Sequence, residues 1–200
     1  MNKSENIQWS ASHLSRDERE ELIGQKGAVV WLTGLSGSGK STIAKELELK
    51  LVKSREVAYI LDGDNIRHGL SSDLGFSDEE RSENIRRIGA AAALFADAGV
   101  VAITAFISPF EKGREVAKNS VGDQRFFEIF LDVPLAVCEE RDPKGLYKKV
   151  RNGEISNFTG IDSPYEKPTH PHLVLNTAEL SVDESVEKIL SMLRENKIIG

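Results

Sequence analysis

The chain has 200 residues, of which 40% are hydrophobic and 29% are charged, a composition that fits one globular domain with its own core. Its formal net charge of −6 excludes a general nucleic-acid-coating surface, because that role needs clustered positive charge. The single cysteine, Cys138, excludes an intrachain disulfide scaffold, and we expect it to be a small buried residue.

Two segments of the chain bear on targeting to or across a membrane. Residues 1–27 are polar and lack the apolar centre of a secretory signal, which predicts a cytoplasmic protein. Residues 88–107 are mostly apolar but include Asp97, which would cost roughly 2.5–3.5 kcal/mol near the centre of a bilayer. This stretch therefore predicts a buried helix that runs into a buried strand, with no membrane partner.

The first half of the chain alternates between strand and helix patterns. An apolar run at residues 28–33 predicts a strand buried on both faces. A glycine-rich turn follows, and the apolar spacing over residues 41–53 predicts an amphipathic helix. Residues 57–61 predict a second strand. The capping-box pattern at Ser77 and Glu80 then predicts a long helix that ends at Gly99.

The same alternation continues to the C-terminus. Strands are predicted at residues 100–106, 126–131 and 173–175, and helical segments lie near residues 111–119 and 134–141. A last helix runs from Ser181 to about Lys197 and opens with a capping box at Ser181 and Glu184. Strict alternation predicts an α/β three-layer sandwich, a five-stranded parallel sheet with helices on both faces.

Residues 142–171 interrupt this alternation. They are polar, contain four prolines and three glycines, and are basic at their start. A tract of this length without apolar periodicity is more often a functional lid than a connector. We therefore expect a single domain over residues 1–200, with an N-terminal extension at 1–26 and a mobile lid with its adjoining loop at about 142–171.

Residues 34–41 read GLSGSGKS and match the pattern GxxxxGK[ST] between a predicted strand and a predicted helix, the context that this motif requires. Glycines let backbone N–H groups turn inward around phosphate oxygens, and the start of the helix adds its positive dipole end. Lys40 would neutralise the β- and γ-phosphates, and the Ser41 hydroxyl would ligate Mg²⁺. A chance match in a surface turn is the alternative, which the flanking elements disfavour.

Two acidic residues follow the second predicted strand, at the edge where ligands bind in open α/β sheets. Asp62 could hold the waters of the metal, and Asp64 could accept a proton from the hydroxyl of a phosphoryl acceptor. The alternative is an Asp-Gly turn with solvated carboxylates.

Four arginines supply the positive charge that a phosphorylated acceptor would need. Arg81 and Asn84 are three residues apart and share one face of the predicted helix. Arg86 and Arg87 point elsewhere and are expected on a solvated helix surface, as His68 is on its loop. Arg67 precedes the helix.

The nucleotide is predicted to be ATP. A GTPase would carry a guanine-reading Asn-Lys-x-Asp tetrapeptide, which does not occur in the chain. The alternatives that the residues leave open are a kinase of another small metabolite, such as a nucleoside monophosphate or a sugar acid, and a nucleotide-binding switch that works through a partner. Acceptor-dependent formation of ADP would discriminate among them.

Six motifs stand out along the chain, at residues 34–42, 62–70, 75–77 with 81–87, 107–110, 138–147 and 157–161. The first motif alone marks only a P-loop protein, whereas the other five in this order are far more selective. Together they resemble one family, the adenylylsulfate kinases (APS kinases), and the resemblance runs from about Trp9 to the fifth predicted strand.

The resemblance implies a P-loop kinase that transfers the γ-phosphoryl group of Mg-ATP to the 3′-hydroxyl of adenosine 5′-phosphosulfate, giving 3′-phosphoadenylylsulfate in sulfate assimilation. It also implies a homodimer and a separate ATP sulfurylase that makes the acceptor. Some plant relatives carry a regulatory cysteine pair, and Cys138 alone does not provide one. The implied ATP-binding residues are Gly34, Leu35, Ser36, Gly37, Ser38, Gly39, Lys40, Ser41, Thr42, Arg141 and Lys144.

On the acceptor side, the resemblance implies that Phe76 and Phe158 enclose the adenine of adenylylsulfate, and stacking on aromatic faces suits a planar base. The implied contacts to the rest of the acceptor come from Asp64, Arg67, Arg81, Asn84, Ile107 and Ser108. The family is traditionally assigned a phosphoserine intermediate at Ser108. The alternative is a Ser-Pro turn whose hydroxyl only binds substrate, and we expect direct transfer because the local sequence offers Ser108 no base.

Overall fold

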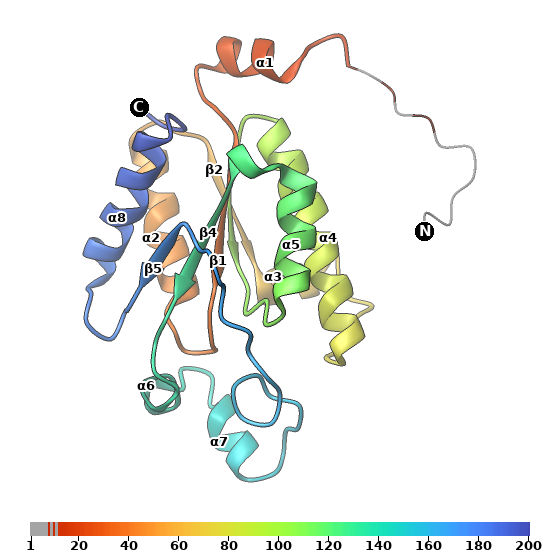
Figure 1. Cartoon of the computed structure of the whole chain (residues 1–200), viewed down its shortest axis with the longest axis vertical. Coiled ribbons are helices and arrows are strands. Elements are labelled where there is room, and N and C mark those ends of the chain that lie inside the picture. Colours follow the sequence, from red (N-terminus) through yellow and green to blue (C-terminus); the bar gives the residue numbers. More distant parts are fainter. Residues whose placement is uncertain (1–7, 9, 11) are drawn as a thin grey trace.

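The computed structural model describes residues 8, 10 and 12–200, and Figure 1 shows a central sheet with helices on both sides. Five parallel strands pair in the order β2-β3-β1-β4-β5. The strands are β1 (Ala28–Thr33), β2 (Ala58–Asp62), β3 (Val101–Ala105), β4 (Phe126–Leu131) and β5 (Leu173–Leu175). The predicted α/β sandwich and its five strands are confirmed, with strand ends that shift by at most one residue.

The described helices include every one that the sequence predicts, and their ends lie within about two residues of the predicted limits. Both predicted capping boxes, at Ser77 and Ser181, are present. The helices are α1 (Arg16–Ile23), α2 (Lys40–Lys53), α3 (Gly63–Arg67), α4 (Asp78–Asp97), α5 (Glu111–Val121), α6 (Leu135–Arg141), α7 (Leu146–Arg151) and α8 (Val182–Glu195), with a 3₁₀ turn at Asp123–Arg125.

Three of these helices, α1, α3 and α7, were not predicted. Helices α3 and α7 have five and six residues, too few to display a helical period of apolar residues. Helix α1 does carry a capping box at Ser15 and Glu18, a signal that sequence reasoning missed. Helix α7 also corrects the view of residues 142–171 as a tract that interrupts the regular structure.

The side chains of β1 alternate between two hydrophobic layers, as a strand buried on both faces requires. Val30 and Leu32 pack in the layer under α2 and α8, whereas Val29 and Trp31 pack in the layer under α4 and α5. Trp31 is fully buried between Phe106 and Phe126. Each face of the sheet therefore has its own helical cover (Figure 1).

The chain changes face between β1 and β3, which are neighbours in the sheet. Helix α2 leaves β1 on one face, and α5 leaves β3 on the other. The loops that follow these two strands therefore diverge at the carboxyl edge of the sheet, the place where open α/β sheets bind ligands.

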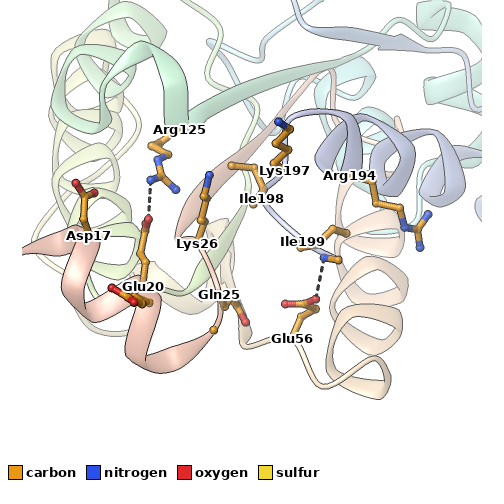
Figure 2. A pocket seen from close by; sticks show the side chains of 13 residues that line it. Asp17, Glu20, Gln25, Lys26, Glu56, Arg125, Arg194, Lys197, Ile198 and Ile199 are labelled. Carbon is orange, nitrogen blue, oxygen red and sulfur yellow. Dashed lines mark hydrogen bonds and ion pairs between the residues drawn. The ribbon is translucent and has the colours of Figure 1, made fainter.

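The predicted N-terminal extension contains α1, which docks on the rest of the fold. Arg16 and Arg19 pair with Asp97 at the end of α4, at 3.0 and 3.1 Å. Glu20 is buried and pairs with Arg125 at 2.7 Å. A cavity of about 650 Å³ lies beside this contact and the C-terminal residues (Figure 2). It is at the amino ends of the strands, opposite the edge where ligands are expected.

Two further expectations concern burial. Cys138 is a free, fully buried residue, as predicted. The apolar stretch at residues 88–107 forms the end of α4 and the whole of β3. In the described part of the chain, none of the helices is both long enough and apolar enough to cross a membrane.

Gly89 lets α4 and α5 approach closely, and its replacement should test that packing. A Cβ atom at Gly89 would lie 2.7 Å from the Cα atom of Ala117, closer than real contacts allow. We expect Gly89→Leu to lower the free energy of unfolding by about 1–3 kcal/mol or more through overpacking. Gly69→Leu is the control, because a Cβ there meets nothing within 4 Å. Urea unfolding of both variants checks this, and equal stabilities would contradict it.

Candidate active site

The loop between β1 and α2 is built on glycines in conformations that other residues rarely adopt. Gly34, Gly37 and Gly39 have φ values of 148°, 77° and 95°. A Cβ at Gly34 would lie 2.8 Å from the carbonyl oxygen of Leu131, and one at Gly37 would lie 2.7 Å from that of Cys138. The predicted phosphate loop therefore depends on glycine both for its turns and for its close packing on the neighbouring backbone.

Lys40 starts α2 and is buried, with 8% of the residue exposed. Its ammonium group donates to the carbonyl oxygens of Gly34 at 2.8 Å and Leu35 at 2.6 Å. Burial lowers the pKa of Lys40 to about 7. The loop thus holds a desolvated cation at its centre, which suits a tightly bound anion.

Ser41 and Asp62 meet at the carboxyl edge of the sheet, from α2 and from the end of β2. The Ser41 hydroxyl donates to one oxygen of Asp62 at 2.9 Å, and the backbone N–H of Asp64 donates to the other at 3.0 Å. In the described residues no group of three or more acidic, histidine or cysteine side chains forms a metal cage. Two oxygen donors beside a phosphate loop fit Mg²⁺, which keeps several waters and takes its other ligands from phosphates.

Asp64 is exposed on α3, two residues after Asp62, and forms an ion pair with Lys144. Lys144 comes from the predicted lid, far from Asp64 in sequence. The fold therefore brings the expected acid of the acceptor site and the expected phosphate-contacting lysine together.

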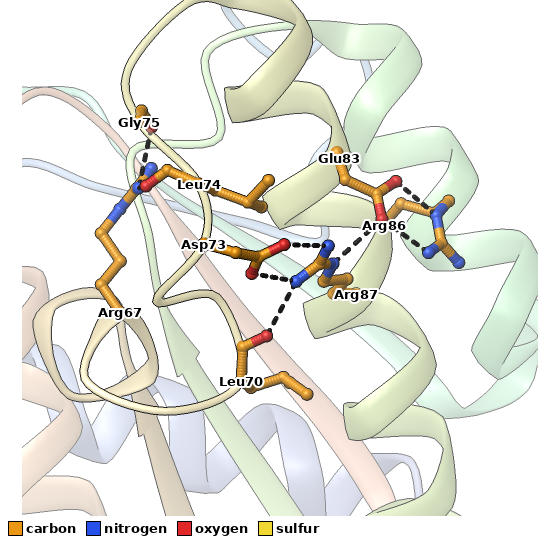
Figure 3. A network of polar contacts seen from close by, with 8 residues as sticks. All are labelled: Arg67, Leu70, Asp73, Leu74, Gly75, Glu83, Arg86 and Arg87. Carbon is orange, nitrogen blue, oxygen red and sulfur yellow. Dashed lines mark hydrogen bonds and ion pairs between the residues drawn. The ribbon is translucent and has the colours of Figure 1, made fainter.

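Arg67 and Phe76 lie against each other on the segment between β2 and α4. The guanidinium group of Arg67 is 4.3 Å from the centre of the Phe76 ring. It also donates to the carbonyl oxygens of Leu74 and Gly75, at 2.9 and 2.8 Å (Figure 3). Phe76 is 66% exposed. An exposed ring backed by a cation is not core packing, and it leaves one face free for a planar ligand.

Arg86 and Arg87 take part in a structural network at the start of α4 (Figure 3). Both pair with Glu83, at 2.7 and 3.0 Å, and Arg87 also pairs with Asp73 at 2.6 Å. Arg86 is exposed as expected, whereas Arg87 is only partly exposed and ties the loop before α4 to the helix. Neither guanidinium is directed to the predicted acceptor contacts, in agreement with the sequence analysis.

Arg81 and Asn84 share the inner face of α4, as predicted. Arg81 donates to the hydroxyls of Thr159 at 3.3 Å and Ser163 at 3.2 Å and to the carbonyl of Asn157. Asn84 is buried, and its side-chain oxygen has no hydrogen-bond partner among the described residues. A buried unpaired amide oxygen is costly, so Asn84 is a good candidate for a ligand contact.

Phe158 is half-buried in the small apolar cluster under α6 and α7. Its ring meets that of Tyr147 edge-on, with centroids 5.0 Å apart. The Tyr147 hydroxyl in turn donates to the carbonyl of Ser36 in the phosphate loop at 2.9 Å. Tyr147, which sequence reasoning missed, therefore connects the predicted lid to the phosphate loop, and Phe158 has a packing role in addition to any contact with substrate.

Arg141 lies at the other end of the phosphate loop. It donates to the hydroxyl of Thr177 at 2.9 Å and to the carbonyl of Thr177 at 2.7 Å. The Thr177 hydroxyl donates to the carbonyl of Ser38 at 2.9 Å. Thr177 follows β5 and carried no motif signal, so only the fold reveals it. Thr42 is exposed in the first turn of α2, beside Ser41.

Ser108 follows β3 and is buried, with 2% exposed. Its hydroxyl donates to Thr33 at 2.9 Å and accepts from the indole N–H of Trp31 at 3.1 Å. The Thr33 hydroxyl also donates to the carbonyl of Ile107 at 2.7 Å. Ser108 therefore belongs to an internal hydrogen-bond network, and no carboxylate or histidine contacts its hydroxyl in the described part of the chain.

These features agree with the comparisons with known proteins. A model of the adenylylsulphate kinase family matches residues 26–176. The chain is 53% identical over 197 residues to the adenylyl-sulfate kinase of Clostridium acetobutylicum, a match that covers 98% of each chain.

Solved structures give the same result. The APS kinase of Mycobacterium tuberculosis in complex with AMPPNP and APS has a TM-score of 0.82 and 49% identity, covering 85% of this chain and 99% of that one. A hexameric APS kinase from Thiobacillus denitrificans has a TM-score of 0.68 and 30% identity, covering 92% of this chain and 32% of that one. The chain belongs to the adenylylsulfate kinase family.

Proposed function

We propose that this enzyme transfers the γ-phosphoryl group of ATP to the 3′-hydroxyl of adenylylsulfate, giving ADP and 3′-phosphoadenylylsulfate. One observation carries the proposal. The carboxylate of Asp62 accepts from Ser41 of the phosphate loop and from the N–H of Asp64, at 2.9 and 3.0 Å. One oxygen of Asp62 is therefore bonded to the phosphate loop, and the other is bonded to the backbone of Asp64, the expected proton acceptor.

On the donor side, the backbone N–H groups of residues 34–41 and the ammonium of Lys40 bind the phosphates of ATP, with Arg141 at the nucleoside end of the loop. Ser41 and Asp62 would hold Mg²⁺, directly or through water, and the ion would neutralise charge on the transferring group. Positioning and charge neutralisation account for most of the catalysis of phosphoryl transfer.

On the acceptor side, the resemblance assigns Phe76 and Phe158 to the adenine, and the exposed Phe76 ring supports this. Arg67 and Arg81 carry the positive charge for the phosphosulfate, and the unpaired side-chain oxygen of Asn84 can accept a hydrogen bond from a hydroxyl or amine of adenylylsulfate. In this structure both arginines contact backbone carbonyls. Binding of an anion would give each guanidinium a stronger partner.

Asp64 would accept the proton of the 3′-hydroxyl as that oxygen attacks the γ-phosphorus. Lys144, its partner in this structure, would move to the phosphates when ATP is bound. We further propose, on the strength of the family resemblance, a homodimer that receives adenylylsulfate from a separate ATP sulfurylase.

The acceptor dependence of ADP formation tests the proposed function. With Mg-ATP, the protein should form ADP in step with 3′-phosphoadenylylsulfate when adenylylsulfate is added, and little ADP with AMP, gluconate or no acceptor. Lys40→Ala should lower turnover by about 10²-fold or more. Lys53→Ala, an exposed lysine on the same helix, should leave it unchanged. ADP formation without any acceptor would instead indicate a hydrolysing switch, and formation with gluconate a sugar-acid kinase.

The lowered pKa of Lys40 predicts that nucleotide binding takes up a proton. With a pKa of about 7, the Lys40 side chain is mostly a neutral amine at pH 8. The negative charge of the ATP phosphates should raise this pKa, so that Lys40 takes up a proton when ATP binds. Calorimetry in buffers of different ionisation enthalpy should show this uptake at pH 8 and its loss near pH 5.5, where Lys40 is already charged. Lys40→Met is the control, and identical proton exchange in both proteins would contradict the prediction.

Replacement of Phe76 and of Phe158 should affect adenylylsulfate binding and protein stability to different extents. Phe76→Ala removes an exposed ring, so it should weaken adenylylsulfate binding by about 1–3 kcal/mol while changing the free energy of unfolding little. Phe158→Ala should weaken both, because its ring also packs on Tyr147. Calorimetric titration with each nucleotide, together with urea unfolding, checks this. Equal losses of ATP and adenylylsulfate affinity in Phe76→Ala would show that the ring does not serve the acceptor.

Ser108 should not carry a phosphoryl group during turnover. Its buried hydroxyl is committed to Thr33 and Trp31, and direct transfer needs no second ester. Ser108→Ala should keep substantial turnover, bind the acceptor more weakly and lose about 1–3 kcal/mol of stability, since the Trp31 N–H loses its partner. The configuration at a chiral γ-phosphorus should be inverted. Retention, or a phosphoserine formed and discharged at the rate of turnover, would establish the covalent route.

A further inference from the structure

A buried ion pair lies directly behind the loop that follows β3. Arg114 of α5 and Glu128 of β4 approach to 2.8 Å between Nε and Oε1, with 3% and 15% of their side chains exposed. The two side chains form a close, buried charge pair, and the Nη2 atom of Arg114 has no hydrogen-bond partner among the described residues. Such a buried pair is weak support for stability, since desolvation of the two charges offsets most of their attraction. Its presence therefore suggests a role other than stabilising the core.

The Arg114 guanidinium also hydrogen-bonds to the backbone of the site. Its Nη1 donates to the carbonyl oxygen of Ser108 at 2.8 Å. Ser108 has a φ of 40°, in the left-handed region that residues other than glycine seldom adopt. A conformation of this kind persists when the surroundings impose it, and such residues cluster at functional sites. Arg114 holds the Ser108 carbonyl by a hydrogen bond, and Trp31 and Thr33 hold the Ser108 hydroxyl by two more.

The loop after β3, residues 106–110, occupies a central position at the carboxyl edge of the sheet. Strand β3 lies between β2, which leads to Asp62 and Asp64, and β1, which leads to the phosphate loop. Residues 106–110 therefore leave the sheet between the expected proton acceptor and the expected phosphate site. Ser108 has 2% of its surface exposed and Arg114 also has 2%, so Arg114 lies behind the loop rather than in the site.

The end of the predicted lid is attached at the same point. The Tyr165 hydroxyl hydrogen-bonds to that of Thr33 at 2.8 Å, and the N–H of Glu166 donates to the carbonyl of Pro109 at 2.8 Å. The Arg114 guanidinium is also 6.0 Å from the centre of the Tyr165 ring. Arg114 thus sits where the loop after β3 meets residues 165–166.

We propose that Arg114, held by Glu128, is a positioning residue that fixes the backbone of residues 107–109 and thereby shapes the acceptor half of the site. It contacts no substrate and acts through the Ser108 carbonyl. The inference rests on the proposed function, because it assigns residues 107–109 to the adenylylsulfate pocket. It predicts that loss of Arg114 damages acceptor binding and leaves ATP binding intact.

The chain contains a matched control at the opposite end of the sheet. Arg125 pairs with the buried Glu20 at 2.7 Å (Figure 2). It also donates to the carbonyl of Gly27 at 3.1 Å. It has the same chemistry as Arg114, a partly or wholly buried arginine between a glutamate and a backbone carbonyl, but it lies at the amino ends of the strands. A purely structural role would make the two arginines equivalent in kinetics.

Steady-state kinetics of the full-length enzyme test the proposal with Arg114→Met and Arg125→Met, at a temperature where circular dichroism shows both to be folded. Arg114→Met should raise KM for adenylylsulfate about tenfold or more, because small misplacements in a site are amplified in this way, and change KM for ATP less than twofold. Arg125→Met should change neither KM more than twofold. Glu128→Gln, which keeps the shape of the side chain, should reproduce the acceptor-selective effect more weakly and provides the test if Arg114→Met does not fold.

The outcomes distinguish a failure of the proposed function from a failure of the positioning role of Arg114. If the wild-type enzyme does not phosphorylate adenylylsulfate, the proposed function fails. If the wild type is active but the Arg114 and Glu128 variants alter both KM values equally, or behave like Arg125→Met, the positioning role is overturned. An acceptor-selective rise in KM that is absent from Arg125→Met supports it.

Discussion

The site depends on one constraint of the sheet, the change of face between the neighbouring strands β1 and β3. Because α2 and α5 leave these strands on opposite faces, the loops after them separate at the carboxyl edge. One loop is then free to wrap phosphates with backbone N–H groups, and the other is the loop that we propose lines the acceptor. Asp62, from the strand beyond β3, reaches back to Ser41 and joins the two halves.

Burial of charge is the second feature that the site uses. Lys40 is held away from water against the carbonyl oxygens of Gly34 and Leu35. In a desolvated setting an electrostatic contact is stronger than in water, so a buried cation favours a bound polyanion far more than an exposed one does. The net charge of the whole chain, −6, says nothing of this, because the relevant cations are few and local.

Residues 142–171 are attached to the site at several separate points. Tyr147 hydrogen-bonds to the phosphate loop, Lys144 pairs with Asp64, and Arg81 of α4 contacts the segment at Asn157. Each of these contacts joins a residue expected to bind a substrate, or its immediate neighbour, to the predicted lid. A substrate that competes for Lys144 or Arg81 would therefore change how this segment is held.

The sequence by itself determined the strand and helix alternation, the phosphate loop and the acids after β2, because each is encoded by a local pattern of apolar spacing or by a compact motif. Tertiary structure alone revealed the contacts of Thr177 and Tyr147 with Arg141 and the phosphate loop, because these partners are distant in sequence. It also showed that Ser108 is an internal hydrogen-bonding residue and that the ring of Phe158 packs on that of Tyr147. Burial and partner geometry arise only when the strands assemble, so the composition of a motif cannot reveal them.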